Sequence, residues 1–272
     1  MNNELNEFDY LAQKKEKYSF DDLCLLADLL RREGGCPWDR EQTHKSIRKD
    51  IIEETYEVIE AIDNADPALL REELGDLLWQ VVFHAQLERE EGRSDINDII
   101  HDICAKLVHR HPHVFGTVVA ETSDVVLSNW EQIKTEEKNR NTVTSKLKSV
   151  PPALPALMRA QKVGKRAPFF DFADANEVIA KLEEEIAELK EAIATGNGDD
   201  VKEEFGDVLF TSVSLARKLG FDAEESLSFA TDKFIGRFSR LEDAVIADGK
   251  DITSLSMTEL DAIWDRIKHS KN

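Results

Sequence analysis

The sequence predicts an all-α protein made of two tandem copies of one helical domain. Nearly every long segment of the 272 residues repeats its apolar residues with helical period, and almost none alternates as a strand would. An acidic pattern, Glu-Glu-x-x-Glu followed by Glu-x-x-Asp, occurs twice with identical internal spacing. The second occurrence begins 131 residues after the first, and a repeat of that length indicates two copies of one structural unit.

Helical period and terminal signals place the elements of the first copy. Asp66 before Pro67 and Asp95 after Ser94 are helix-start signals, and Gly92 is a stop signal. Pro112 should end the helix that precedes it, because proline lacks the N–H that a helix interior needs. The predicted helices cover residues 20–33, 43–64, 66–92, 95–110 and 124–138.

The second copy repeats this order. Gly220 and Gly249 are stop signals, and the helix carrying Lys233 runs on without a proline. The predicted helices cover residues 153–165, 174–196, 199–219, 222–247 and 257–269. A polar segment that ends in two prolines separates the copies. The predicted division is an extension over 1–17, a first domain over 18–138, a linker over 139–152 and a second domain over 153–272.

Composition excludes several classes of function. The formal charge of −20 argues against binding nucleic acid, whose phosphates require a basic face. No apolar run reaches the ~20 residues needed to cross a bilayer. The charged N-terminal segment lacks the apolar stretch of a secretion signal, so we expect a cytoplasmic protein without membrane partners. Three widely spaced cysteines indicate neither a disulfide framework nor a zinc site.

The paired acidic motifs are the candidate metal site. Their members are Glu53, Glu54, Glu57, Glu73 and Asp76 in the first copy and Glu184, Glu185, Glu188, Glu204 and Asp207 in the second. Residues three or four apart share a helix face, so two adjacent antiparallel helices can bring these carboxylates together. Ligation by oxygen alone suits Mg²⁺ or Mn²⁺. Metal-assisted phosphoryl chemistry is therefore the expected activity.

Basic and aromatic residues of the second copy suit a nucleotide substrate. Lys233 and Arg237 are four residues apart on one predicted helix and could hold phosphates, and Lys268 could add a third cation. Trp264, or the adjacent pair Phe169 and Phe170 elsewhere in the chain, could stack on a base. In the first copy, Lys106, Arg110, Trp130 and Lys134 take corresponding places.

The two acidic motifs, together with GCPWDREQT, HRHPHVF, WEQIK and PALMRAQK, resemble the tandem-domain MazG family over about residues 18–270. The resemblance implies an all-α, Mg²⁺-dependent homodimer that binds nucleotides such as ATP and hydrolyses NTPs or dNTPs to the monophosphate and pyrophosphate. It implies that Glu185, Glu188, Glu204 and Asp207, and Glu54, Glu57, Glu73 and Asp76, hold metal. For Glu184 and Glu53 it implies water activation or a further metal ligand. It places Lys233, Arg237, Trp264 and Lys268 in the active domain.

The second copy is expected to be the main catalytic one. The first retains all its acids, but Pro112 follows Arg110 almost at once and should interrupt the helix that carries the phosphate-binding cations. Our mechanistic hypothesis is attack of water on the α-phosphorus, with Glu184 orienting that water and pyrophosphate leaving.

Two other classes of protein remain to be weighed. A non-catalytic helical scaffold could carry such acids only for solubility. A di-iron carboxylate bundle is disfavoured, because neither copy places a histidine three residues after a motif glutamate. His109, His111 and His113 are poorly spaced for a helix-borne zinc site, and Cys36 has no evident base to activate it.

Overall fold

The computed structural model describes residues 6–13, 16–120, 122–137 and 142–269. These residues form fourteen α-helices and one short 3-10 helix, and none of them forms a strand, which confirms the predicted all-α class. The chain divides into two compact units, Met1–Lys134 and Thr135–Asn272. No helix among the described residues is long and apolar enough to span a membrane.

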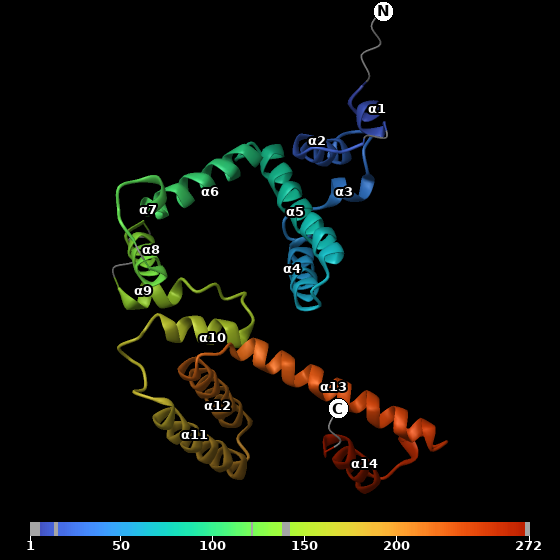
Figure 1. Cartoon of the computed structure of the whole chain (residues 1–272), viewed down its shortest axis with the longest axis vertical. Helices are drawn as coiled ribbons and strands as arrows, with labels where there is room; N and C mark the ends of the chain where they lie inside the picture. Colours follow the sequence, from blue (N-terminus) through green and yellow to red (C-terminus); the bar gives the residue numbers. More distant parts are fainter. Residues whose placement is uncertain (1–5, 14–15, 121, 138–141, 270–272) are drawn as a thin grey trace, which may run out of the picture. The chain divides into compact units, whose positions relative to one another are not determined.

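The first unit is built around one helical hairpin (Figure 1). Its helices are α1 (Glu7–Ala12), α2 (Phe20–Arg31), α3 (Pro37–Glu41), α4 (Arg48–Asp63), α5 (Pro67–Glu90), α6 (Ile96–Arg110), α7 (Pro112–Phe115) and most of α8 (Ser123–Glu137). Helices α4 and α5 pack along their length, and the Asp66 carboxylate caps α5 by accepting from the N–H groups of Ala68 and Leu69. Ile47, Phe83 and Leu87 form the buried cluster, with Trp79 packed against it.

Helix α4 begins five residues later than the predicted 43–64. The Thr43 N–H donates to Ser46 Oγ at 2.9 Å, and the Ser46 N–H donates to Thr43 Oγ1 at 3.2 Å. These side-chain bonds give the backbone an alternative to helix, as is typical of serine and threonine. The predicted start was therefore wrong, although the rest of the helix was confirmed.

The second unit repeats the hairpin. Its helices are α9 (Val143–Lys148), α10 (Ala156–Lys165), α11 (Ala175–Thr195), α12 (Gly198–Leu219), α13 (Ala223–Ala247) and α14 (Met257–His269), with the 3-10 helix η1 (Ile252–Ser254). Gly196, at φ 75°, ends α11 in the left-handed region that glycine adopts freely, and Asn197 caps α12. This two-residue turn makes α11 and α12 antiparallel neighbours (Figure 1).

Two predicted boundaries need correction in this part of the chain. The predicted linker 139–152 includes helix α9, while its residues 139–141 lie outside the described part. Helix α10 begins at Ala156 rather than at residue 153, because Pro155 disfavours helical backbone at the residue before it.

Helix α13 extends well beyond the hairpin. The side chain of Gln161 in α10 holds the start of α13 by bonding to the Phe221 carbonyl and the Ala223 N–H, both at 3.1 Å. From there α13 leads away from α11 and α12, and α14 packs against it (Figure 1). In the first unit the corresponding helix, α6, ends at Arg110 before Pro112, as predicted.

Candidate active site

The acids of the second copy converge on one point of the α11–α12 hairpin. Glu185 and Glu188 lie about one helical turn apart on one face of α11, and Glu204 lies on α12. One carboxylate oxygen from each of the three lies within 4.8 Å of the others. Such a cluster can hold a divalent cation with oxygen ligands. We call it the second-copy triad.

The first copy builds the same arrangement from α4 and α5. Glu54, Glu57 and Glu73 also bring one oxygen each within 4.8 Å, and we call them the first-copy triad. Asp76 and Asp207, the fourth predicted ligands, are not members of the triads. They lie close enough to act electrostatically, since Asp76 raises the pKa of Glu54 and Asp207 raises that of Glu204.

In both triads the negative charge of the carboxylates exceeds the positive charge of neighbouring groups. The pKa values of Glu54, Glu73, Glu188 and Glu204 are all raised. Burial is the largest cause in each case, and neighbouring carboxylates raise each pKa further. A bound cation would remove both penalties, so the donor set fits a hard divalent metal ion.

One lysine distinguishes the second-copy triad. Lys181 Nζ lies 3.0 Å from Glu185 and 2.8 Å from Glu184, and both carboxylates raise the pKa of the lysine. Glu185 itself is 6% exposed and is the most buried of the six triad acids. The first copy has Asp50 at the position equivalent to Lys181, so it lacks this cation. The prediction from sequence overlooked Lys181, although its position four residues before Glu185 was a usable signal.

The leading glutamates lie outside the triads. Glu184 is exposed and ion-paired with Lys181, one residue from the buried Glu185. Glu53 is likewise exposed and next to Glu54. Their placement fits groups that act beside a metal site from the solvent side.

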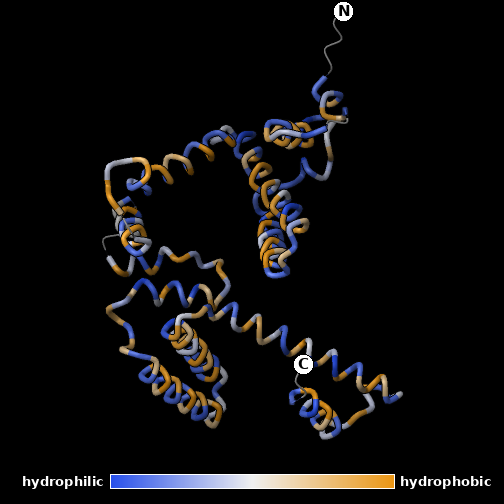
Figure 2. Tube along the Cα trace, viewed as in Figure 1, coloured by the Kyte–Doolittle hydropathy of each residue, from blue (hydrophilic) through white to orange (hydrophobic). Residues whose placement is uncertain are grey.

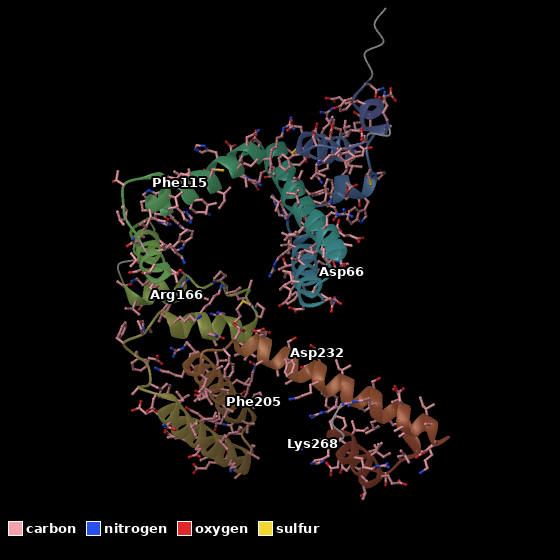
Figure 3. All side chains as sticks on the ribbon, in the orientation of Figure 1. Asp66, Phe115, Arg166, Phe205, Asp232 and Lys268 are labelled. Atoms are coloured by element: carbon pink, nitrogen blue, oxygen red, sulfur yellow. The ribbon has the colours of Figure 1, made fainter. Side chains whose placement is uncertain are left out.

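The predicted phosphate-binding residues gather on α13 and α14. Lys233 Nζ lies 5.7 Å from the centre of the Phe229 ring, and Trp264 packs on Phe234 with ring centres 5.3 Å apart. Figure 3 shows the region around Asp232 and Lys268 well away from Phe205, the neighbour of Glu204 on α12. Among the described residues, α14 packs against α13 but not closely against α11 or α12, which carry the second-copy triad.

Their first-copy counterparts are arranged differently. Arg110, the last residue of α6, is 8% exposed, and its guanidinium lies 5.4 Å from the centre of the Trp130 ring. His111 packs edge-on against the same ring. Arg110 is thus occupied by packing, whereas Arg237 in the middle of α13 is partly exposed.

The predicted base-stacking residue Phe169 lines a different feature. It is 72% exposed beside a cavity of about 300 Å³ lined by Phe169, Phe170, Asp171, Phe172 and Glu177. No triad acid lines this cavity. Asp171 anchors the segment through a bidentate ion pair with Arg217 and a 2.9 Å contact with Lys218.

Known proteins are similar in sequence to this chain over most of its length. The MazG nucleotide pyrophosphohydrolase domain matches residues 42–115 and 174–240, which include both triads. A nucleoside triphosphate pyrophosphohydrolase of Escherichia coli is 46% identical over 92% of this chain and 96% of its own length. A nucleoside triphosphate pyrophosphohydrolase/pyrophosphatase MazG of Thermotoga maritima is 42% identical over 92% of this chain and 95% of its own.

A shorter match involves a nucleoside triphosphate pyrophosphohydrolase of Mycobacterium tuberculosis, which is 40% identical over 54% of this chain and 44% of its own length. Taken with the duplicated hairpin and its two carboxylate triads, these similarities confirm the predicted family: the chain belongs to the MazG family of nucleotide pyrophosphohydrolases.

Proposed function

We propose that the chain hydrolyses nucleoside triphosphates to the monophosphate and pyrophosphate, and that the second-copy triad is the main catalytic centre. The observation that carries this proposal is the convergence of Glu185, Glu188 and Glu204 within 4.8 Å in a chain so closely related to nucleoside triphosphate pyrophosphohydrolases. A scaffold that used acids only for solubility would not need to gather them where their mutual repulsion raises their pKa values.

Mg²⁺, with Mn²⁺ as a substitute, is the proposed cofactor. Glu185, Glu188 and Glu204, with Asp207 beside them, would hold it. When bound, such an ion would neutralise negative charge that develops on the phosphates and would make water a better nucleophile. The chain's own residues then have distinct tasks.

Glu184 is proposed to accept a hydrogen bond from the attacking water and orient it toward the α-phosphorus. A P–O bond to that water forms, the bond between the α-phosphorus and its bridging oxygen breaks, and pyrophosphate leaves. Lys233 and Arg237 hold the phosphates, Lys268 adds a third cation, and Trp264 or Phe169 stacks on the base.

The second copy is favoured over the first by two contrasts. Lys181 accompanies Glu185, whereas Asp50 takes the equivalent place beside Glu54. Arg237 is available on a continuous helix, whereas Arg110 is buried against Trp130. The acids of the first-copy triad could still bind a cation, but Arg110, the counterpart of Arg237, is held against Trp130.

A homodimer is proposed as the active form. Many large apolar side chains of the second unit are exposed, and α13 presents a series of them: Leu227, Phe229, Phe234, Ile235, Phe238 and Ile246 are 43–68% exposed. Figure 2 shows hydrophobic stretches recurring along α13, the helix that also carries Lys233 and Arg237. Exposed apolar area of this extent indicates a protein interface. A second copy seated on α13 would bring triad and cations together without a change in either hairpin.

The remaining assignments follow the composition. We propose that the chain acts in the cytoplasm and has no nucleic-acid partner, because its net charge of −20 disfavours binding to phosphate backbones.

Product analysis tests the reaction. The chain is incubated with Mg²⁺, ¹⁸O-labelled water and a panel of NTPs and dNTPs. The expected products are unlabelled pyrophosphate and a monophosphate carrying one ¹⁸O atom. Release of single orthophosphate from the γ end, or label in the pyrophosphate, would contradict attack at the α-phosphorus.

A further inference from the structure

A pair of histidines in the first unit is used by neither triad. His44 lies in the turn before α4, and His84 lies on α5. Their rings are nearly parallel, with 9° between the planes, and their Nδ1 atoms are 2.6 Å apart. Two ring nitrogens at this distance share one proton, so one ring donates and the other accepts.

The outer nitrogens of the pair face different surroundings. His44 Nε2 lies 2.8 Å from Glu88 Oε1, and Glu88 is also ion-paired with Arg93 at 2.6 Å. His44 Nε2 is nevertheless buried without a hydrogen bond, and His84 Nε2 is likewise buried without a hydrogen-bond partner among the described residues. Each neutral ring carries one proton, so the neutral pair carries two. A third proton would either place N–H against N–H between the rings or leave a buried N–H without an acceptor, and both are unfavourable.

We propose that His44 and His84 form an acid-sensitive latch, which holds segment 42–47 and the start of α4 on α5 while the pair is neutral and releases them when the pair takes up one further proton. The pair joins residues 40 positions apart in the chain. His44 lies shortly before Ile47, which is buried. Release would therefore loosen the first unit at the end of the α4–α5 hairpin where Ile47, Phe83 and Leu87 pack.

The charges around the pair set the pH range. Burial is the main cause that lowers the pKa of His84, and the charge of His44 lowers it further, while Glu88 on α5 acts in the opposite direction. Arg93, in the turn after α5, holds the pKa of Glu88 at about 2, with His44 contributing. On the α4 side, the packed neighbour is the apolar Ile47.

The direction in which stability changes with pH follows from proton binding. His84 has a lowered pKa in the folded state, so below about pH 6.5 the unfolded or opened state binds more protons than the folded state. Stability is thus present above that pH and is lost as the pH falls below it. Glu88 stays ionised throughout this range, because its own loss would begin only below about pH 4.5.

Hydrogen exchange on the full-length chain at pH 7.5 and pH 5.5, corrected for intrinsic exchange, tests the latch. Opening of residues 42–52 should increase by up to about tenfold per pH unit below pH 6.5, as one extra proton requires. Helix α10, in the second unit, serves as the reference. His84→Gln keeps a side chain that can donate to His44 Nδ1 but cannot titrate, so the pH dependence should disappear. His101→Gln, at an exposed position on α6, should leave it intact.

Nitrogen NMR of the wild-type histidines provides a test that needs no variant. His84 should titrate below its ordinary pKa of about 6.5. The latch is refuted if opening of 42–52 does not change with pH in the wild type, if His84→Gln retains the full pH dependence, or if His84 titrates at or above its ordinary pKa.

Discussion

Glu185 combines burial, negative charge and a cationic neighbour in one residue. It is 6% exposed, converges with Glu188 and Glu204, and pairs with Lys181. A carboxylate is costly to bury unless it is compensated, so its surroundings must supply positive charge. Lys181 supplies part of it, and a metal ion would supply the rest.

The first prediction compares Glu185 with its counterpart in the first copy. Glu185→Gln should lower turnover at least about 100-fold, because the loss of a direct metal ligand should exceed the 10–100-fold cost of changing an outer partner. Glu54→Gln makes the same change in the first-copy triad and should cost less than about threefold if that copy is not catalytic. Pyrophosphate release at saturating Mg²⁺ measures both.

Equal losses in the two variants would contradict the division of labour between the copies. Glu183→Gln, an exposed change outside the triad on the same helix, controls for the loss of one negative charge.

The second prediction concerns the charge of Glu204. Its pKa is raised by burial and by Glu188, Asp207 and Glu185, so the folded chain holds this proton more tightly than the unfolded chain. Stability without metal should therefore fall as the pH rises from about 4.5 through the raised pKa. At pH 7 in EDTA, Glu204→Gln should raise Tm, and Mg²⁺ should raise the Tm of the wild type more than that of the variant. Equal Mg²⁺ effects in a thermal scan would show that Glu204 does not bind the ion.

At the scale of elements, the helical hairpin is the unit that makes each triad. Residues within each turn determine where its helices end and begin. Asp66 caps α5 in the first copy, and in the second copy Gly196 ends α11 and Asn197 caps α12. Once the hairpin closes, residues one turn apart on one helix must face the next helix. Spacing therefore predicted the three acids that converge in each copy, although it also predicted Asp76 and Asp207, which lie outside the triads.

The third prediction tests the element that precedes α11. Asp171 ties residues 166–174 to the end of α12 through Arg217 and Lys218, and the Asp171 and Arg217 side chains are only 11% and 14% exposed. Asp171→Asn should destabilise the chain by about 2 kcal/mol at pH 7, because it leaves a largely buried guanidinium without its carboxylate partner. Urea unfolding measures the change, and Asp243→Asn on the exposed face of α13 is the control.

The stability difference between wild type and Asp171→Asn should change with pH in a definite direction. Arg217 and Lys218 hold the pKa of Asp171 well below its usual range, so its contribution is present above about pH 4 and is lost as the pH falls further. The difference between wild type and Asp171→Asn should therefore shrink between pH 5 and pH 3. A constant difference would mean that the carboxylate charge is not what stabilises the segment.

For the molecule as a whole, the proposed homodimer depends on the separation of triad and cations. The fourth prediction mixes two inactive variants, Glu185→Gln and Lys233→Ala. If each site takes its acids from one chain and its cations from the other, random exchange gives half heterodimers with one intact site of two, and so about a quarter of wild-type activity. Turnover after mixing and subunit exchange measures this.

No recovery in a mixture shown to exchange subunits would place the complete site within one chain. Two variants in the same group, Glu185→Gln and Glu188→Gln, should not complement each other and provide the matched control.

Sequence patterns predicted the long helices, the duplication and the interruption at Pro112, but not the short helices α1, α3, α7 and α9. These features depend on periodicity, spacing and local stop signals among residues near one another in the chain. Where local bonds competed with helix, as at Thr43–Ser46, the prediction failed.

Which equivalent residues differ in environment depends on how the helices pack in space. The burial of Arg110 against Trp130, the burial of Glu185 beside Lys181, and the meeting of His44 with His84 depend on contacts whose free energy is set by packing between helices. Spacing along the chain places a side chain on a helix face, but burial and the neighbouring charges, which govern its pKa and its reactivity, are determined when that face closes against another.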